Sequence, residues 1–346
     1  MQYSPAGRIT GFTKTTAANA PVDAATFSYD ANGNRTASTR DVAASTTSRT
    51  YGGDASHNRL LGFEQTVTAG SNSASTSVTY QYNSAGDLLG DGLTSYCYDS
   101  EGRMESARTG QGEDAPTTKY AHNGLGQRVF KTEPLYSNTQ SRDSKKNLNN
   151  LLADEDDKET QAEPIGLIQQ ILNFFSKLWS PGTSDAEKLG YSYIYAEDGS
   201  LLGEYGSGGS NSTGTAQYIY LPTASGPMPI AAVIKGQTYA VHSDHLNTPR
   251  KLTQPDGQVA WKWAYSAFGD EQPTIGAKRF TSESTNPTTG ATSIPEVTFN
   301  LRYRGQYFDP EIKLHYNYFR SYSLTMGWSY TQGDPIGLDG GIDLPM

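Results

Sequence analysis

Apolar and polar residues alternate along much of this chain, and many of the apolar positions are aromatic. The alternation is clear in residues 77–82 and 191–195, and residues 299–307 and 316–322 carry aromatic residues at steps of two or four. A period of two with aromatic residues is typical of β-strands. The pattern therefore predicts an all-β protein.

A short unit recurs between the predicted strands, with an aromatic residue four positions before a glycine. The aromatic residue can pack across to a partner strand, and Asp or Asn after it can bond its own backbone to open a turn. The glycine supplies the positive φ that such a turn needs. Repetition of the unit predicts stacked β-hairpins. The units are Tyr3–Gly7, Tyr29–Gly33, Tyr82–Gly86, Tyr98–Gly102, His122–Gly126, Tyr195–Gly199 and Tyr265–Gly269.

Two stretches depart from the repeat. Residues 36–80 are rich in Ser, Thr and Ala but still alternate in places, which favours degenerate repeats with polar outward faces over a flexible loop. Residues 137–163 are polar and then acidic, as in an exposed linker.

Residues 165–179 carry apolar side chains at helical spacing and predict one amphipathic helix. The helix could dock on the β-structure, bind a partner's groove or lie at a membrane interface. Its nearly neutral polar face argues against the membrane, because interfacial helices are usually basic there. We therefore divide the chain into a repeat sheet (1–134), a linker with an inserted helix (135–190) and a second β-region (191–346).

Composition agrees with a sheet protein. Hydrophobic residues make up 35% of the 346 residues, but Tyr occurs 23 times and Gly 36 times. Disordered chains are poor in aromatic residues, so this chain is expected to fold. Its net charge of −9, without an arginine-rich tract, excludes binding to a nucleic-acid backbone as an expected function.

The single cysteine, Cys97, excludes an intrachain disulfide framework and any multi-cysteine metal site. Because it lies between Tyr96 and Tyr98, we expect a buried structural thiol. The first residues show no secretory signal peptide, and no apolar run is long enough to span a bilayer.

His242, Asp244 and His245 are residue types that can bind a divalent metal. Along a strand, however, His242 and Asp244 would share one face while His245 faces away. The Asn-Thr-Pro-Arg that follows is turn chemistry, so we expect these groups to bond backbone at a strand end. The sequence predicts no metal site and no cofactor.

Asp334 is the candidate catalytic residue, in the turn Asp-Pro-Ile-Gly-Leu. Peptide hydrolysis by carboxyl groups uses two carboxylates that share one proton. No spacing identifies a partner for Asp334, and the residues alone favour a structural turn. The nearest acids in the sequence are Asp309, Glu311, Asp339 and Asp343.

The Tyr-Asp-x-x-Gly-Arg units resemble YD repeats, and five motifs between about 239 and 341 resemble the bacterial RHS repeat-associated core domain. The resemblance implies a β-sheet that spirals into a hollow shell around a variable C-terminal toxin. It also implies that the last part of the core plugs the shell and acts as an aspartic autoprotease. The motifs are Asp244–Arg250, Trp261–Gly269, Arg304–Asp309, Leu314–Asn317 and Asp334–Leu338.

The chain departs from that family near its C-terminus. It has Arg320-Ser-Tyr-Ser-Leu where the family has Arg-Tyr-Tyr-Asp-Pro, and Trp328 where the family has arginine after a glycine. Asp334 matches the first family aspartate, but the second acidic motif would lie beyond Met346. The partner aspartate is therefore missing, and we expect no autoproteolysis.

These inferences give an all-β fold of YD-repeat hairpins, stacked into a curved or spiral sheet as a partial shell. The expected function is a structural shell fragment that encloses or presents a toxin absent from this chain. One alternative is an autoprotease in which Asp334 pairs with Asp309 or Asp339. Another is a surface module whose tyrosine-rich sheet binds glycans or serves adhesion.

The resemblance also implies partners and a location. The partners are a toxin domain or the rest of a larger shell, with a secretion-apparatus or chaperone protein in addition. The protein would be bacterial, cytoplasmic before export and secreted or at the cell surface afterwards, by a route without a signal peptide. Family members use type VI secretion, toxin complexes or surface display.

Overall fold

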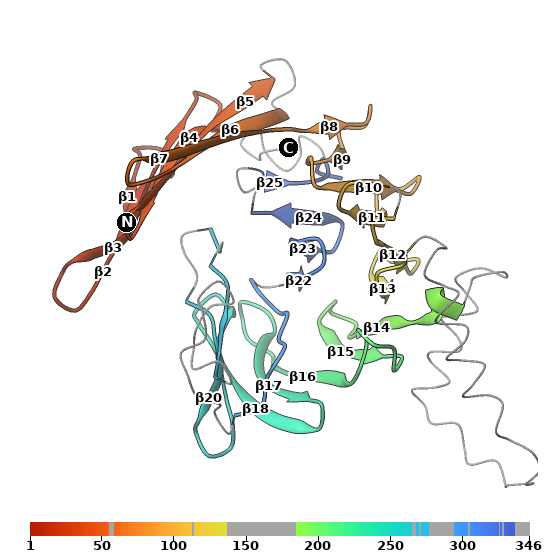
Figure 1. The fold of residues 1–346 in the computed structure, drawn as a ribbon. Coiled ribbons are helices and arrows are strands. Elements are labelled where there is room, and N and C mark those ends of the chain that lie inside the picture. Colours follow the sequence, from red (N-terminus) through yellow and green to blue (C-terminus); the bar gives the residue numbers. More distant parts are fainter. Residues whose placement is uncertain are drawn as a thin grey trace, which may run out of the picture. The chain divides into compact units, whose positions relative to one another are not determined.

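The computed structural model describes residues 1–54, 59–112, 114–136, 185–264, 268–269, 271–276, 294–303, 305–324, 326 and 329–335 (Figure 1). Within these residues, regular structure is antiparallel β-strand apart from the short 3-10 helix Asp185–Lys188. The all-β prediction is confirmed. The predicted helix at 165–179 and most of the predicted linker lie outside the described residues.

Contacts divide the chain into two units. Unit 1 comprises residues 1–95, 264–271 and 313–346, and unit 2 comprises residues 96–263 and 272–312. Each unit is described by itself below. The division into 1–134, 135–190 and 191–346 remains a prediction.

Unit 1 contains a seven-stranded sheet whose strands lie side by side in sequence order. The segment 36–80 contributes most of it, so this segment forms strands and not a flexible loop. The seven strands are β1 (Gln2–Tyr3), β2 (Ile9–Thr15), β3 (Pro21–Tyr29), β4 (Arg35–Val42), β5 (Ser45–Asp54), β6 (Arg59–Ala69) and β7 (Asn72–Thr79). The unit also holds β8 (Gln81–Tyr82), β9 (Leu88–Gly90), the start of β10 (Thr94–Tyr98), β23 (Leu314–Asn317), β24 (Arg320–Ser323) and β25 (Ser329–Tyr330).

Unit 2 is an antiparallel meander in which β11 to β21 also follow sequence order. β13 and β14 pair directly through Phe130↔Ser192, so the predicted insertion between them leaves the sheet uninterrupted. The strands are β11 (Met104–Thr109), β12 (Thr117–His122), β13 (Arg128–Thr132), β14 (Gly190–Tyr195), β15 (Leu201–Gly206), β16 (Thr215–Leu221), β17 (Met228–Ile234), β18 (Gln237–Ser243), β19 (Pro249–Thr253), β20 (Val259–Lys262) and β21 (Thr274–Ile275); β22 (Tyr307–Asp309) lies outside the meander.

The repeated sequence unit forms one repeated turn. All seven of its glycines have positive φ, between 75° and 98°. In six of the turns the residue after the aromatic donates its amide to the carbonyl four positions on, and the glycine amide donates back to that residue's carbonyl. This is a tight turn closed by a glycine bulge. In one example Asp99 Oδ1 also accepts from the amide of Arg103 at 3.0 Å, so the predicted role of Asp is confirmed.

Three further turns have the same backbone bonds without the aromatic residue, at Thr16–Ala20, Asp244–Thr248 and Gln254–Gln258. Asn19 and Asn247 take the positive φ, 59° and 61°, in the first two, and Gly257 takes it in the third. Asn tolerates this conformation better than most other side chains. Because Thr15, Ser243 and Thr253 replace the aromatic residue, the sequence pattern did not reveal these three units.

Tyrosine hydroxyls join successive hairpins. Tyr29 donates to Ile9 O at 2.7 Å, and Tyr195 donates to Arg128 O at 2.9 Å. Each acceptor lies two residues after the glycine of an earlier unit. The recurring tyrosine therefore packs across the sheet and also satisfies a backbone carbonyl at the neighbouring turn.

One face of the unit 2 meander is buried and the other is largely open, as period two requires. Partners that face one another across neighbouring strands share the buried face, and all are at most 9% exposed. On the opposite face Ile219 is 50% exposed. The buried pairs include Tyr120↔Lys131, Tyr193↔Glu204, Tyr218↔Ala232, Leu252↔Trp261 and Trp261↔Ile275.

Residues 294–303 and 305–312 contact this buried face, and we call them the strap. The ring of Phe299 meets Tyr218 and Trp261, with centroids 5.9 and 5.1 Å apart. The guanidinium of Arg302 lies 5.2 Å from the ring centroid of Trp263. Most of the core of unit 2 therefore lies between the sheet and the strap.

The prediction that Cys97 is buried is wrong, since the thiol is exposed. Neighbouring residues on a strand point to opposite faces. Tyr96, which is 2% exposed, takes the buried face of β10 and directs Cys97 to the other.

At Gly102 the turn requires glycine for its φ and not for space, and one substitution separates these two causes. A Cβ at Gly102 would meet nothing within 4 Å, but φ is +75° there. Gly102→Ala should lower the free energy of unfolding by about 1–2 kcal/mol. Gly124→Ala is the matched control, with the same open space and an ordinary φ, and should cause little change. Denaturant titration measures both, and equal effects would contradict the assignment.

Candidate functional site

The strap is held to the sheet by charged residues of one strand, β13. Arg128 and Lys131 are three positions apart and would face opposite sides of a regular strand. The register shift where β12 pairs with β13 leaves one residue of β13 unpaired, and a bulge of this kind re-aims side chains. Both cations reach the strap, where Asp309 ends β22 and Glu311 follows it.

The four side chains form what we call the ionic cluster. Arg128 holds Asp309 with two bonds, Nη1–Oδ2 at 2.6 Å and Nη2–Oδ1 at 3.1 Å. Lys131 Nζ lies 3.1 Å from Asp309 Oδ1 and 3.0 Å from Glu311 Oε1. The side chains of Arg128 and Asp309 are 3% and 1% exposed. Two cations and two carboxylates thus neutralise one another, and the buried pair Arg128–Asp309 has the geometry of strong bidentate pairing.

Aromatic rings surround the arginine of this cluster. Its guanidinium carbon lies 5.1 Å from the ring centroid of Tyr193, 5.3 Å from that of Tyr120 and 5.4 Å from that of Tyr307. Cation–π contacts of this kind strengthen when water is excluded. The sheet contributes Tyr120 and Tyr193, while the strap contributes Tyr307.

The charges of the cluster decide the ionisation of Asp309. Burial alone would raise its pKa, but the positive charges of Arg128 and Lys131 outweigh burial and lower the pKa below the ordinary 3.8. Asp309 is therefore ionised in the folded protein at neutral pH. Its carboxylate holds the strap by charge.

A second contact between strap and sheet centres on Glu204 of β15. Both Tyr218 of β16 and Tyr307 of the strap donate their hydroxyls to its carboxyl group, the latter at 2.5 Å. Asn300 in turn donates its amide to the Tyr307 oxygen at 3.0 Å. Burial raises the pKa of Glu204 above 4.5, although the phenol donors act in the opposite direction. Glu204 therefore keeps its proton to higher pH than an exposed glutamate.

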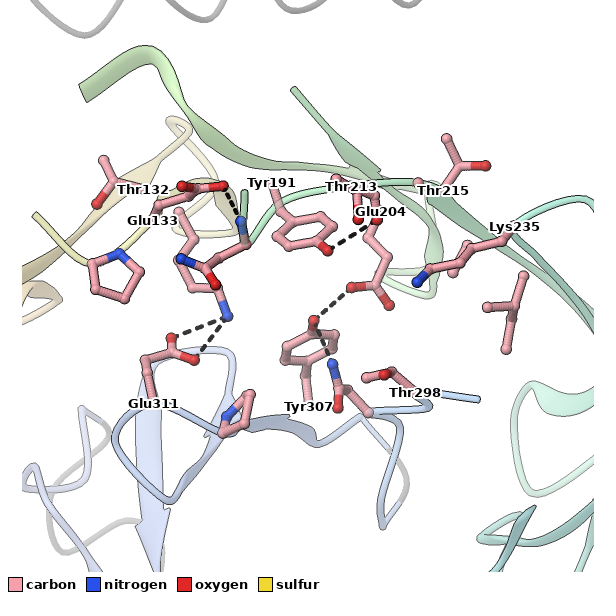
Figure 2. A pocket seen from close by; sticks show the side chains of 18 residues that line it. Thr132, Glu133, Tyr191, Glu204, Thr213, Thr215, Lys235, Thr298, Tyr307 and Glu311 are labelled. Carbon is pink, nitrogen blue, oxygen red and sulfur yellow. Dashed lines mark hydrogen bonds and ion pairs between the residues drawn. The ribbon is translucent and has the colours of Figure 1, made fainter. Parts of the chain in front are cut away.

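A pocket of about 360 Å³ lies beside these contacts in unit 2. Figure 2 shows Glu204 and Tyr307 pointing toward each other in it, with Glu133 and Glu311 also among its lining side chains. Glu133 accepts from the amide of Asn211 at 2.7 Å and is engaged with a loop. The lining also includes threonine hydroxyls and the side chains of Lys131 and Lys235. This arrangement is suited to fixing the strap.

Asp334, the predicted catalytic residue, lies in unit 1 beside Arg320. Arg320 Nη1 is 3.0 Å from Asp334 Oδ2, and the two side chains are 17% and 10% exposed. The Arg320 guanidinium also lies 3.9 Å from the ring centroid of Tyr330. An arginine-bound carboxylate in a turn is consistent with a structural role, and the catalytic role of Asp334 stays a prediction. Asp339 and Asp343 lie outside the described residues.

Asp309 is poorly suited to the aspartic dyad considered from the sequence. It is the last residue of β22 and deeply buried. A dyad needs two carboxylates that share one proton. Because two cations lower the pKa of Asp309, this carboxylate does not readily hold that proton.

His242, Asp244 and His245 lie at a strand end and turn. Asp244 Oδ1 accepts from the amides of Leu246 and Thr248 at 2.9 and 3.0 Å. Among the described residues, no group of three or more His, Cys, Asp or Glu side chains is placed to hold a metal ion. No helix in the described part of the chain is long and apolar enough to cross a membrane.

Sequence reasoning missed Arg128, Lys131 and Glu204. The signal for Glu204 is a lone acid in the strand LLGEYG, at a position that faces inward. Arg128 and Lys131 lie in RVFKT, a strand buried at every position. A charged residue inside a buried strand indicates that it has an ion-pair partner. The sequence does not identify that partner, because it lies in the strap; Asp309 is 178 positions away from Lys131.

Removal of the Asp309 carboxylate should destabilise unit 2 strongly. Asp309→Ala leaves Arg128 buried and uncompensated, which typically costs about 3–5 kcal/mol of folding free energy. Glu101→Gln is the control, because its ion pair with Arg103 is exposed and worth little. Denaturant titration reports both, and a loss below about 1 kcal/mol for Asp309→Ala would contradict the role of the cluster.

Asp309 and Glu204 should make the stability of the folded protein depend on pH in opposite directions. The stabilisation from Asp309 is complete above pH 3.8 and is lost as the pH falls through its lowered pKa. That from Glu204 is complete below pH 4.5 and is lost as the pH rises through its raised pKa. The test is the Tm measured as a function of pH. In Asp309→Asn the fall in Tm at acidic pH should become shallower. In Glu204→Gln the decline in Tm above pH 4.5 should become shallower. An unchanged decline in Glu204→Gln would refute the assignment.

Two bacterial toxins are similar in sequence to this chain. Double-stranded DNA deaminase toxin A of Burkholderia cenocepacia is 25% identical over 249 residues, which is 72% of this chain and 14% of that protein. Toxin protein Tse5 of Pseudomonas aeruginosa is 32% identical over 100 residues, which is 29% of this chain and 6% of that protein. No family model matches the chain.

Among solved structures, the Photorhabdus luminescens Tc holotoxin pore is similar with a TM-score of 0.51 and 14% identity. The match covers 99% of this chain and 16% of that chain. This chain therefore spans a small part of each protein that it matches. It has the β-fold of a toxin-complex component, and its sequence is similar to bacterial toxins.

Proposed function

We propose that this chain is a structural, non-enzymatic wall segment of an RHS-type bacterial toxin system, and that it encloses or presents a C-terminal toxin. The observation that carries the proposal is the strap, fixed by a buried ionic cluster across one face of a hairpin meander. Similarity to two toxin proteins and to the Tc holotoxin fold supports the same role.

The meander is suited to a wall. Many of the hairpins close through the same turn, so the sheet grows by repetition of one unit. One face of the unit 2 sheet is packed while the other faces solvent, so the sheet has two chemically different sides. A wall needs this distinction between its sides.

The proposed partners follow from the small part of each related protein that this chain covers. It spans 14% of one toxin protein and 6% of the other. A toxin domain and the remainder of a larger shell are accordingly the proposed partners, together with a secretion-apparatus or chaperone protein. We propose that the assembled protein is secreted or displayed at the cell surface.

The charged groups also favour a structural role over turnover. Asp309 is held by two cations, and Asp334 is paired with Arg320. A carboxyl group that acts as an acid in peptide hydrolysis must hold a proton at the working pH. The two cations beside Asp309, which lower the pKa of its carboxyl group, act against this.

A fusion experiment tests enclosure and self-cleavage together. A small ribonuclease is fused after Met346 and exposed to proteinase K, beside the same ribonuclease fused to an unrelated β-protein through the same linker. Enclosure predicts that the ribonuclease attached to this chain is degraded at least tenfold more slowly, because a protease must reach an extended segment to cut it. Equal degradation rates would overturn enclosure.

The same fusion, incubated without protease at neutral and acidic pH, is weighed by mass spectrometry. A structural role predicts one intact mass throughout. Release of the ribonuclease that is abolished in Asp334→Asn would establish the autoprotease alternative and end the non-enzymatic proposal.

A further inference from the structure

Within the described residues, the edge strand β7 leaves one side of the unit 1 sheet without a paired strand. The strand order of this sheet ends at β7, which pairs with β6 from Ala69↔Asn72 to Gly62↔Thr79. Seven of its eight residues are exposed, all but Val78. A long exposed edge strand is a template for pairing with another chain.

The register shows which backbone groups face outward. A two-residue loop joins β6 to β7, so the closing pair is hydrogen-bonded and the even-numbered residues of β7 bond to β6. The bond from Tyr80 N to Leu61 O, at 3.0 Å, continues this register. The amides and carbonyls of Ser73, Ser75 and Ser77 therefore point away from β6.

The next hairpin is too short to cover this edge. β8 continues beyond β7 and pairs with β9, but the chain then turns back at Asp91, whose amide donates to Thr94 O at 3.1 Å. A Cβ at Gly92 would lie 3.6 Å from Val78 Cγ1, so the tip of this hairpin stops at Val78. Residues 72–77 lie beyond its reach.

The composition of β7 suits pairing with itself. Proteins usually guard an edge with lysine, proline or a bulge, whereas NSASTSVT contains no charge and no proline. Two copies can therefore meet along this strand without charge repulsion, although the whole chain carries −9. Hydroxyl pairs already cross the β6–β7 boundary, as between Thr66 Oγ1 and Ser75 Oγ at 2.9 Å. Cross-strand Ser/Thr pairs stabilise a sheet.

We propose that β7 pairs antiparallel with β7 of a second copy of this chain, about a twofold axis at Ser75. This register sets Ser75 opposite Ser75 and Ser73 opposite Ser77, so that the outward backbone groups bond to one another. The other edge strand, β1, has two residues, so head-to-tail pairing would form few bonds. One strand pair buries less than the roughly 1,200 Å² of a stable complex, so the dimer is weak and reversible.

Sedimentation equilibrium of the full chain, from low to upper micromolar concentration, tests the proposal. Wild type should follow a monomer–dimer equilibrium. Ser75→Lys and Ser75→Glu should each raise the dimer Kd at least about tenfold, because like charges then face each other. An equimolar mixture of these two variants should restore association, since opposite charges meet. Asn32→Lys, at an exposed turn of the same unit, is the matched control and should keep the wild-type Kd.

Ser75→Pro gives a second test. It removes an outward amide without removing a bond to β6, so it should weaken the dimer at least tenfold as well. Circular dichroism and thermal melting of each variant at low concentration verify that the monomer is folded. A wild-type chain that stays monomeric over the whole range would overturn the proposal. So would a Ser75→Lys variant that dimerises as tightly as wild type.

Discussion

The pairing of Arg128 and Lys131 with Asp309 and Glu311 is the interaction on which unit 2 depends. Charges at this depth are stable only when each meets an opposite partner with good geometry, because desolvation of an unpaired ion costs several kcal/mol. The sheet supplies the cations and the strap supplies the anions. Neither part can bury its charges alone, so the cluster makes the strap an obligatory part of the folded sheet.

The aromatic contacts add buried apolar area between the strap and the sheet and help to align the strap on the sheet. Phe299 and Arg302 of the strap pack on tyrosine and tryptophan rings of the sheet, and Tyr307 bonds to Glu204 at the centre. Hydrophobic contact alone is non-directional and would tolerate sliding of the strap. The bidentate bond between Arg128 and Asp309 fixes one position, since its two distances cannot both be met elsewhere.

Local chemistry made the fold predictable. The turn units carry their conformation in the glycine and in the Asp or Asn that precedes it, so sequence spacing alone predicted the hairpins. The units at Asn19, Asn247 and Gly257 were missed because no aromatic residue marks them. The period-two rule also predicts an exposed Cys97 once Tyr96 is assigned to the buried face, but the sequence does not say which face is buried.

The site was less predictable, because its members are far apart in the sequence. Asp309 was singled out as a nearby acid, but its role depends on Arg128 of a distant strand and on a bulge that turns this arginine toward it. Glu204 depends likewise on Tyr307, 103 positions away. Such partners are chosen by tertiary packing, which no local pattern records.

Hydrogen exchange of the strap amides tests the central claim most directly. The amides of Arg302, Gln306 and Phe308 bond within the strap, to Gln306 O, Tyr303 O and Asn300 O. If the ionic cluster joins strap and sheet into one cooperative structure, these amides should exchange as slowly as those of β13 to β16, with the same opening free energy. Exchange that is faster by orders of magnitude at the strap, with the sheet still protected, would contradict the account.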